Sequence, residues 1–369
     1  MSATPTLEEA AKAFRLELHA AKQRIDRDID AYWLAKLSAV RRDFGVVSER
    51  AVEAYAGVMR QGGKRIRGAL AVQAYRLFGG DDDGVAIGAA RLIEMIHAYV
   101  LVIDDVCDRS DLRRGGPTAH RRLTAWHHKA KLRGDAGHFG YSLATLTAVA
   151  GAHEALLQAG RLHVPAERRL AALENLNSLL ITTCHGQFND IFNEVTGTND
   201  LRQVEDVLLW KTAYYTFANP LQFGALLAGA EAPALNQLLE YSLAAGRAFQ
   251  ISDDILGIYG NEAATGKSPL DDLQEGKRTI LVVKALRQGP AEDAAFLEAQ
   301  LGNPRVGLAE LERCRTIIRD SGALAFAQQE VARSVVEAQA ALQGGVLPAD
   351  APGVQFLRGL ASYLTTRQA

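Results

Sequence analysis

The stretch Tyr99–Gly116 reads YVLVIDDVCDRSDLRRGG. An apolar run leads directly into two adjacent aspartates, Asp104 and Asp105, and Asp108 follows one helical turn after Asp104. Buried carboxylates are costly unless they are paired, hydrogen-bonded or bound to a metal. The pattern therefore predicts an apolar helix whose carboxyl end carries a site for a cation.

A second stretch, GRAFQISDDILGIYG, places Asp253 and Asp254 after another largely apolar helical segment. Carboxylate oxygens suit magnesium, which usually binds one or two carboxylates together with substrate phosphate oxygens. A solvated helix end would explain one acidic cluster, but it explains two less well. We therefore expect the two clusters to lie on separate helices that face each other across a cavity.

Basic residues surround both acidic clusters in the sequence. Arginine forms forked contacts with phosphate, whereas lysine supplies a compact charge. Each basic group alone is typical of a solvated surface, but together with two acidic clusters they predict a site for a metal-bound diphosphate and a second anion. The basic residues are Lys64, Arg65, Arg67, Arg113, Arg114, Lys211, Lys267, Lys277 and Arg278.

A different metal centre is suggested by Glu94 and His97, whose spacing is that of the Glu-x-x-His motif in di-iron helical bundles. That chemistry needs a second Glu-x-x-His, and the chain has none. The sequence therefore disfavours a di-iron centre. His97 is better interpreted as a ligand contact or as a satisfied core histidine.

Charge and composition narrow the functional classes. The 369 residues include 41 Lys and Arg and 43 Asp and Glu, so the formal net charge of -2 gives no general reason to expect nucleic-acid binding. Three widely spaced cysteines indicate neither a disulfide framework nor a zinc site. The N-terminus lacks the features of a signal peptide, and no stretch approaches the roughly 18 uninterrupted apolar residues of a membrane span. We predict a cytoplasmic protein without stable membrane insertion.

Helical periodicity runs through almost the whole chain. Apolar residues near the start recur at steps of three, four or seven and predict one face of a long helix: Phe14, Leu18, Ile25, Ile29, Trp33, Leu37 and Val40. Most prolines stand where helices should start or stop, whereas Pro220 is expected either to kink a helix or to begin a new one. The pattern predicts one all-α domain of about ten or more helices.

Together these stretches resemble the trans-isoprenyl diphosphate synthases, the polyprenyl synthetases, and most of all the geranylgeranyl diphosphate synthases. The motifs GGKRIR, DDVCDRSDLRRGGPTAH, GQFND, KT, FQISDD and TGKSPLDDLQEGKRT occur in the family's order. They define a motif-bearing region of about residues 55–285 within one expected domain, 1–369. The resemblance implies a single-domain, all-helical bundle around a deep central cavity, usually in a homodimer.

The resemblance also implies a role for each motif residue. Three magnesium ions would be bound by Asp104, Asp108 and Asp253, with Asp105 and Asp254 in support. The allylic diphosphate, which is dimethylallyl, geranyl or farnesyl diphosphate, would be held by Arg113, Lys211 and Lys267. Isopentenyl diphosphate would be held by Lys64, Arg67, His97 and Arg114. Thr212 and Gln250 would line the reacting centre, and Lys277 and Arg367 would help to close it.

The implied reaction suits these residue types. Magnesium and cationic side chains stabilise charge on the departing diphosphate, and the double bond of isopentenyl diphosphate attacks the resulting allylic cation. Product length would depend on Tyr99 and Val100, five and four residues before Asp104. In the family, an aromatic residue at the fifth position often accompanies a twenty-carbon product. We therefore predict geranylgeranyl diphosphate, with farnesyl or longer diphosphates as alternatives.

One departure from the family pattern is Gly257, which stands where many members have a third aspartate in the second motif. The first two acids remain, so we expect activity to survive. Two other functions stay open. A class I terpene cyclase shares the first aspartate motif, and a non-catalytic subunit of a heteromeric synthase shares the helical fold, although such subunits commonly lose an aspartate cluster.

Overall fold

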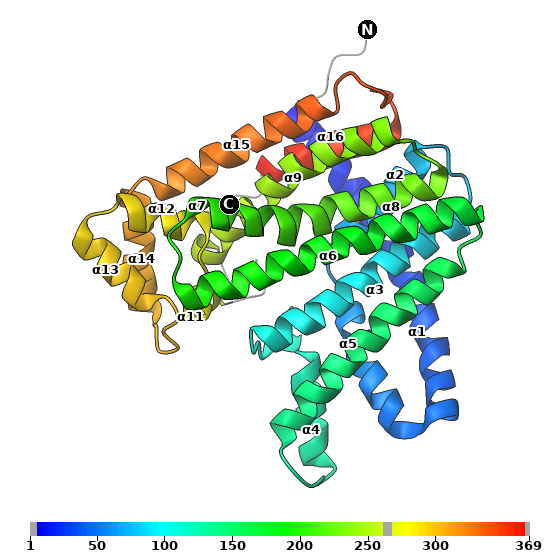
Figure 1. The fold of residues 1–369 in the computed structure, drawn as a ribbon, viewed down its shortest axis with the longest axis horizontal. Coiled ribbons are helices and arrows are strands. Elements are labelled where there is room, and N and C mark those ends of the chain that lie inside the picture. The colour runs from blue at the N-terminus through cyan, green and yellow to red at the C-terminus, as the bar shows by residue number, and fades with distance from the viewer. Residues whose placement is uncertain (1–5, 261–267, 366–369) are drawn as a thin grey trace.

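Helices account for nearly all of the regular structure in residues 6–260 and 268–365, which the computed structural model describes (Figure 1). The first half contains α1 (Leu7–Arg60), α2 (Ile66–Leu77), α3 (Asp83–Cys107), α4 (Ala119–Lys129), α5 (Ala136–Gly160) and α6 (Ala166–Thr196). The second half contains α7 (Leu201–Val207), the π-helix η1 (Leu208–Ala218), α8 (Asn219–Ala228), α9 (Ala232–Tyr259), α11 (Asp271–Glu275), α12 (Ile280–Gln288), α13 (Ala291–Gln300), α14 (Leu308–Asp320), α15 (Ala323–Ala341) and α16 (Pro352–Thr365). The prediction of a single-domain, all-α fold is confirmed.

Helix α1 begins where local sequence favours a helix start. The hydroxyl of Thr6 accepts from the backbone of Glu9, whose carboxylate accepts from the backbone of Thr6, a reciprocal capping box. The predicted apolar face is buried except at Leu37, which is half-buried. The helix kinks at Gly45, which adopts a φ of 82° that L-residues rarely adopt. The kink folds the end of α1 back beside its first arm (Figure 1).

Two apolar clusters form the core of the described residues. One joins α9, α15, α16 and α12 through buried side chains such as Tyr241, Ile251 and Leu360. The other joins both arms of α1 to α3 and α5 through side chains such as Trp33 and Leu92. In Figure 1, α3, α5 and α6 lie as neighbouring rods, with α8 and α9 on the other side of α6. The clusters thus hold rigid helices on both sides of the space between α3 and α9.

Helix α3 is long and apolar enough to cross a membrane by length and composition alone. However, 61% of its most apolar window is buried inside the protein. It packs against α1, α2 and α5. Its apolar character is therefore that of a central helix in the bundle, and its acidic carboxyl end points to the site described below.

The segment η1 departs from α-helical geometry. It runs without a break from α7 into α8, and the backbone N–H of Asn219 donates to the carbonyl of Tyr214, five residues earlier. Such π-helical turns are rare and are frequently found at functional sites. Pro220 follows at the first turn of α8, where its missing N–H is tolerated. Pro220 therefore lies in the first turn of α8, where the continuous helical run changes from π-helical to α-helical winding.

Candidate active site

A cavity of about 600 Å³ lies between α3, α5, α6, η1 and α9. Part of its wall is charged, with Asp104, Asp253 and Lys211 among the lining residues, and much of the rest consists of aliphatic and aromatic side chains such as Leu156 and Phe249. Ten residues singled out in the sequence line it: Arg67, His97, Tyr99, Val100, Asp104, Arg113, Lys211, Thr212, Gln250 and Asp253.

A β-hairpin returns the chain to the acidic end of α3. Strands β1 (Leu112–Arg113) and β2 (Gly116–Pro117) pair in antiparallel fashion. Both residues between them, Arg114 and Gly115, have positive φ values of 52° and 74°, as a two-residue type I′ turn requires. A left-handed arginine is strained by about 1 kcal/mol. The hairpin brings two consecutive arginines to the site, because Arg113 lines the cavity and Arg114 lies beside His97.

Arg113 binds the two adjacent aspartates of the first motif. Its Nε donates to Asp105 Oδ1 at 2.5 Å, and its second nitrogen lies 3.2 Å from Asp104 Oδ2. Burial lowers the pKa of Arg113, but the Asp105 and Asp104 charges more than compensate and raise it above the ordinary value. Asp105 is buried and so acts as a support for Arg113, while Asp104 reaches the cavity.

Lys211, on η1, connects three helices. Its Nζ lies 2.6 Å from Asp190 Oδ2 on α6 and 3.5 Å from Asp104 Oδ1 on α3. Burial lowers the pKa of Lys211, but the two carboxylates raise it above its usual range, so the side chain stays cationic. Gly186 of α6 permits a close approach of α6 to η1, because a Cβ at this position would overlap the backbone nitrogen of Lys211.

A chain of hydrogen bonds links η1 to the second aspartate motif. Thr212 Oγ1 donates to Gln250 Oε1 at 2.7 Å, and Gln250 Nε2 donates to Asp254 Oδ1 at 2.7 Å. These bonds fix the amide orientation of Gln250 at the cavity wall. Asp254 therefore contributes by holding Gln250, whereas Asp253 itself lines the cavity.

A second cationic group lies around His97. Its Nδ1 is 2.7 Å from the hydroxyl of Tyr215, and arginine nitrogens of Arg67 and Arg114 lie 3.4 and 3.5 Å from its Nε2. Burial, followed by the charges of these arginines, lowers the pKa of His97 well below its usual value. The imidazole is therefore neutral. Since arginine can only donate, Nε2 accepts from Arg67 and Arg114, which assigns the proton to Nδ1 and the role of donor toward Tyr215. Arg67 is further held by Thr216 at 2.7 Å.

The carboxylates near the cavity are crowded. Burial and the Asp104 charge raise the pKa of Asp108 to about 7. Burial also raises the pKa of Asp254 to about 8, with further contributions from Asp272 and Asp253 against the Gln250 hydrogen bond. A cation would favour the ionised form of such groups. Their oxygen donors fit magnesium.

A ready-made metal cage is absent from the part of the chain that the structure describes, since no three His, Cys, Asp or Glu side chains converge closely enough to form one. Magnesium commonly keeps several waters and binds one or two carboxylates with substrate phosphates. The separated acids are therefore compatible with magnesium that arrives with a diphosphate.

The family-model comparison matches residues 48–318 to polyprenyl synthetase. The chain belongs to the polyprenyl synthetase family. It is therefore a prenyltransferase, and its relatives agree. It is 34% identical over 259 residues to geranylgeranyl diphosphate synthase of Saccharolobus solfataricus, covering 70% of this chain and 73% of that one. It is 31% identical over 311 residues to geranylfarnesyl diphosphate synthase of Aeropyrum pernix, covering 84% and 92%.

A solved structure shares the fold of this polyprenyl synthetase over nearly its whole length. Geranylgeranyl pyrophosphate synthase of Corynebacterium glutamicum, complexed with isoprenyl diphosphate and magnesium, superposes with a TM-score of 0.86 at 29% identity. The match covers 98% of this chain and 100% of that one. Isoprenyl diphosphates are the substrates of the family.

Other residues singled out in the sequence do not line the cavity of the synthetase, among them Lys64, Arg65 and Lys277. Lys64 is exposed and donates to the Tyr363 hydroxyl of α16 at 3.0 Å. Lys277 pairs with Glu275 at 2.6 Å and Asp272 at 3.5 Å. Lys267 and Arg367 lie outside the described residues. Arg65 and Glu94 form a buried ion pair at 2.9 Å, a structural role.

Sequence reasoning missed several residues of the site. Asp190 ends the motif GQFND, yet nothing in its linear surroundings indicates the ion pair with Lys211. Tyr215 and Thr216 also line the cavity, four residues after Lys211 and Thr212. Their spacing of four residues is typical of one helical face and could have indicated that they are neighbours of Lys211 and Thr212.

Proposed function

We propose that this polyprenyl synthetase condenses isopentenyl diphosphate head to tail with an allylic diphosphate. The single observation that supports the proposal best is the pairing of two separate cationic groups at one apolar cavity. One group is Lys211 with Arg113, beside Asp104, and the other surrounds His97. Such a cavity would accommodate two substrates, each with an anionic diphosphate head and a hydrocarbon tail.

Each group takes one diphosphate in this proposal. Magnesium, in three ions held by Asp104, Asp108 and Asp253, would supply positive charge for the departing diphosphate. Arg113 and Lys211 add fixed cations beside that position, with Lys267 as a further predicted contact. The isopentenyl diphosphate would be bound by Lys64, Arg67, His97 and Arg114.

The rest of the wall protects the cation that forms. Thr212 and Gln250 line the centre with their hydrogen-bonding groups already satisfied by each other and by Asp254. The aromatic and aliphatic side chains below them, including Phe249 and Leu156, exclude water that would quench an allylic cation. Lys277 lies beside the acidic clusters, where it would help to close the site.

The product is proposed to be geranylgeranyl diphosphate. Tyr99 and Val100 both line the cavity one turn before Asp104, so a growing chain would reach them as it descends along α3. One relative is named for a geranylgeranyl product and another for the longer geranylfarnesyl product, so a longer chain is the alternative. Farnesyl diphosphate is the shorter alternative product.

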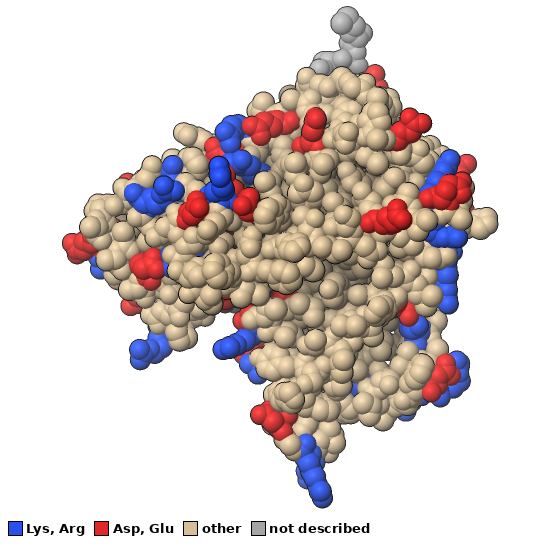
Figure 2. Space-filling view, viewed as in Figure 1, with Lys and Arg blue, Asp and Glu red and all other residues tan. Residues whose placement is uncertain are grey.

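The assembly is proposed to be a cytoplasmic homodimer in which residues 1–369 form one domain. A stripe of exposed apolar residues runs along α6 at steps of seven, four and three: Ile181, Phe188, Phe192 and Val195. Exposed Leu146 and Val149 of α5 extend it. Figure 2 shows few charged side chains over α6, the surface expected for an interface between two copies.

Product analysis tests the proposed function. Purified protein is incubated with magnesium, isopentenyl diphosphate and, in separate reactions, dimethylallyl, geranyl or farnesyl diphosphate, and the dephosphorylated products are identified by chromatography. We expect a twenty-carbon alcohol that requires both substrates. A cyclic hydrocarbon from an allylic diphosphate alone would instead indicate a terpene cyclase, and no product from any pair would indicate a non-catalytic subunit.

A further inference from the structure

Gly257 occupies an unusual place for a glycine. It lies inside α9, one turn after Asp253 and on the same helical face, a spacing that repeats that of Asp104 and Asp108. A glycine in a helix interior costs about 1 kcal/mol relative to alanine. Its presence therefore calls for a reason in the packing around it.

The reason is the carboxylate of Asp272. A Cβ at position 257 would overlap Asp272 Oδ2 and would lie 3.1 Å from its Cγ. The carboxylate thus fills the space that a side chain at position 257 would take. It comes from α11, which follows α9 in the sequence and packs against it.

The surroundings of Asp272 connect it to both aspartate motifs. Its Oδ1 lies 3.5 Å from Nζ of Lys277, which is also bound by Glu275 at 2.6 Å. Its charge acts on Asp254 of the second motif. Lys277 in turn interacts electrostatically with Asp108 of the first motif. Asp272 therefore stands where a third aspartate of the second motif would place its charge.

We propose that Asp272 supplies, from α11, the carboxylate that the second aspartate motif lacks at position 257. Asp272 is then a positioning residue, because it holds Lys277 and adds negative charge beside Asp253 and Asp254. Gly257 is its steric counterpart. The inference rests on the proposed function, in which Asp253 binds magnesium together with diphosphate.

An exchange of the two positions tests the inference. The variants are Asp272→Ala, Gly257→Asp and the double variant Gly257→Asp/Asp272→Ala, with Asp271→Asn as a control that removes the neighbouring carboxylate of α11. Two quantities are measured for each: the magnesium concentration that gives half-maximal turnover, and the rise in melting temperature caused by magnesium with inorganic diphosphate. The second measurement does not depend on catalytic turnover.

We expect Asp272→Ala to raise the half-maximal magnesium concentration about 10- to 100-fold, the usual effect of losing a residue that supports metal ligands. Its melting temperature should respond less to magnesium and diphosphate. Gly257→Asp alone should lower the melting temperature without ligand, because two carboxylates then compete for one space. The double variant should recover most of the magnesium dependence lost in Asp272→Ala and most of the melting temperature lost in Gly257→Asp. Asp271→Asn should resemble the wild type in both measurements.

The inference is overturned if Asp272→Ala keeps the wild-type magnesium dependence and ligand-induced stabilisation, or if Asp271→Asn matches its losses. A double variant no better than Asp272→Ala also overturns it. If Gly257→Asp does not fold, the comparison of Asp272→Ala with Asp271→Asn still decides. Wild-type protein that makes no product but shows the expected stabilisation pattern would contradict the proposed reaction alone.

Discussion

At the scale of single residues, the charge of Asp104 should matter more than its shape. Asp104→Asn keeps the size of the side chain but removes the anion that faces Lys211 and Arg113, and Asp253→Asn does the same in the second motif. Losing several kcal/mol of charge stabilisation should lower turnover roughly a thousandfold. Steady-state rates at saturating magnesium measure this, with far-ultraviolet circular dichroism to verify folding.

The matched control for these substitutions is Asp320→Asn at the end of α14. Its side chain is 64% exposed and pairs with the neighbouring Arg319. It should retain wild-type turnover. Near-normal rates in both Asp104→Asn and Asp253→Asn would contradict a mechanism that depends on the two acidic motifs.

The two cationic groups should separate in kinetics. Arg67→Gln removes a cation from the group around His97 and should mainly raise KM for isopentenyl diphosphate. Lys211→Gln removes the cation beside Asp104 and should mainly impair the allylic partner, in KM or kcat. Initial rates with each substrate varied in turn provide the test. Equal defects toward both substrates in both variants would show that the two anions are not divided in this way.

Residue spacing could predict part of this site because some contacts are local. Asp104, Asp105 and Arg113 are close in sequence, so a helix followed by a turn is enough to bring them together. The pair Asp190 and Lys211 depends on how α6 packs against η1, which no linear pattern specifies. The same holds for Asp272, whose relation to Gly257 appears only when α11 packs against α9.

At the scale of elements, α3 should control product length. Tyr99 and Val100 lie on the cavity wall one turn before Asp104, and one turn of 5.4 Å is roughly the length of an isoprene unit. Tyr99→Ala should therefore shift the products upward by one or more units, whereas Tyr99→Phe should preserve their length. Chromatography of dephosphorylated products measures the shift. An unchanged distribution in active Tyr99→Ala would move the length determinant to another wall.

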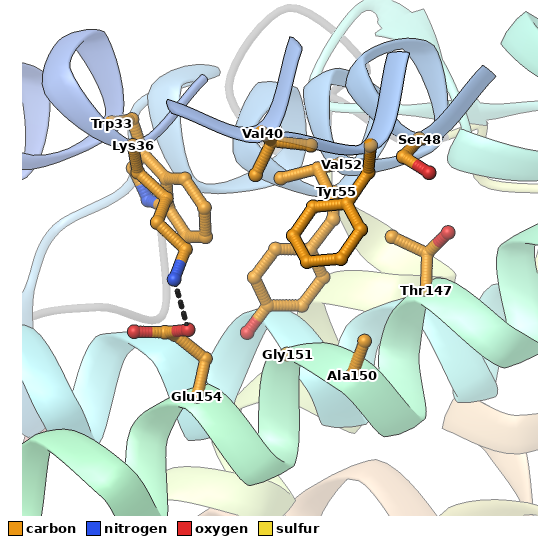
Figure 3. A pocket seen from close by; sticks show the side chains of 11 residues that line it. Trp33, Lys36, Val40, Ser48, Val52, Tyr55, Thr147, Ala150, Gly151 and Glu154 are labelled. Atoms are coloured by element: carbon orange, nitrogen blue, oxygen red, sulfur yellow. Dashed lines mark hydrogen bonds and ion pairs between the residues drawn. The ribbon is translucent and has the colours of Figure 1, made fainter. Parts of the chain in front are cut away.

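A second cavity, of about 210 Å³, lies between the two arms of α1 and α5 (Figure 3). Glu154 of α5 lines it and binds Lys36, which extends from α1, at 2.6 Å, and it also accepts from the Tyr32 hydroxyl and, at 2.9 Å, from Gln158. Burial raises the pKa of Glu154, but these hydrogen bonds lower it overall. The ion pair thus ties α1 to α5.

Glu154→Gln should destabilise the protein by about 1 to 3 kcal/mol at neutral pH, because Lys36 loses its anion. Since the folded state lowers the pKa below the ordinary 4.5, this contribution is complete above that pH and is lost as the pH falls through the folded value. The difference in melting temperature from wild type should shrink in acid. Exposed Glu337→Gln serves as control. A difference that stays constant with pH would rule out the ionised carboxylate as its source.

Elements were predictable where the pattern was long and regular. The apolar face of α1 and the proline-marked helix boundaries follow from local preferences that packing reinforces. The hairpin of β1 and β2 is too short for strand periodicity, and it depends on an arginine with positive φ. The segment η1 packs closely against α6 and α9, as at Gly246, where a Cβ would overlap Ala213, and no linear pattern indicates its π-helical geometry.

At the scale of the whole molecule, the apolar stripe of α6 predicts the oligomeric state. Val195 and Leu146 are 77% and 64% exposed and do not line the cavity. Val195→Glu with Leu146→Glu should convert a dimer to monomers, because charges would be buried at the interface. Light scattering after size-exclusion chromatography measures the mass. Exposed Val336→Glu on α15 is the control, and a wild-type monomer would contradict the interface.

The π-helix η1 has a consequence for how this chain tolerates insertions and deletions. A π-turn corresponds to an α-helix with an extra residue, and here Lys211, Thr212, Tyr215 and Thr216 all line one wall of the cavity within the wider turn. Deleting one residue between the two pairs would let α-helical winding return while α7 and α8 keep their packing, but the spacing within the wall would fall from four residues to three. Substitutions in this segment alter one side chain each, whereas a single-codon deletion would change the spacing between the two pairs that line the wall. Reading-frame-preserving indels should therefore be far rarer in functional variants here than in the loop between α13 and α14.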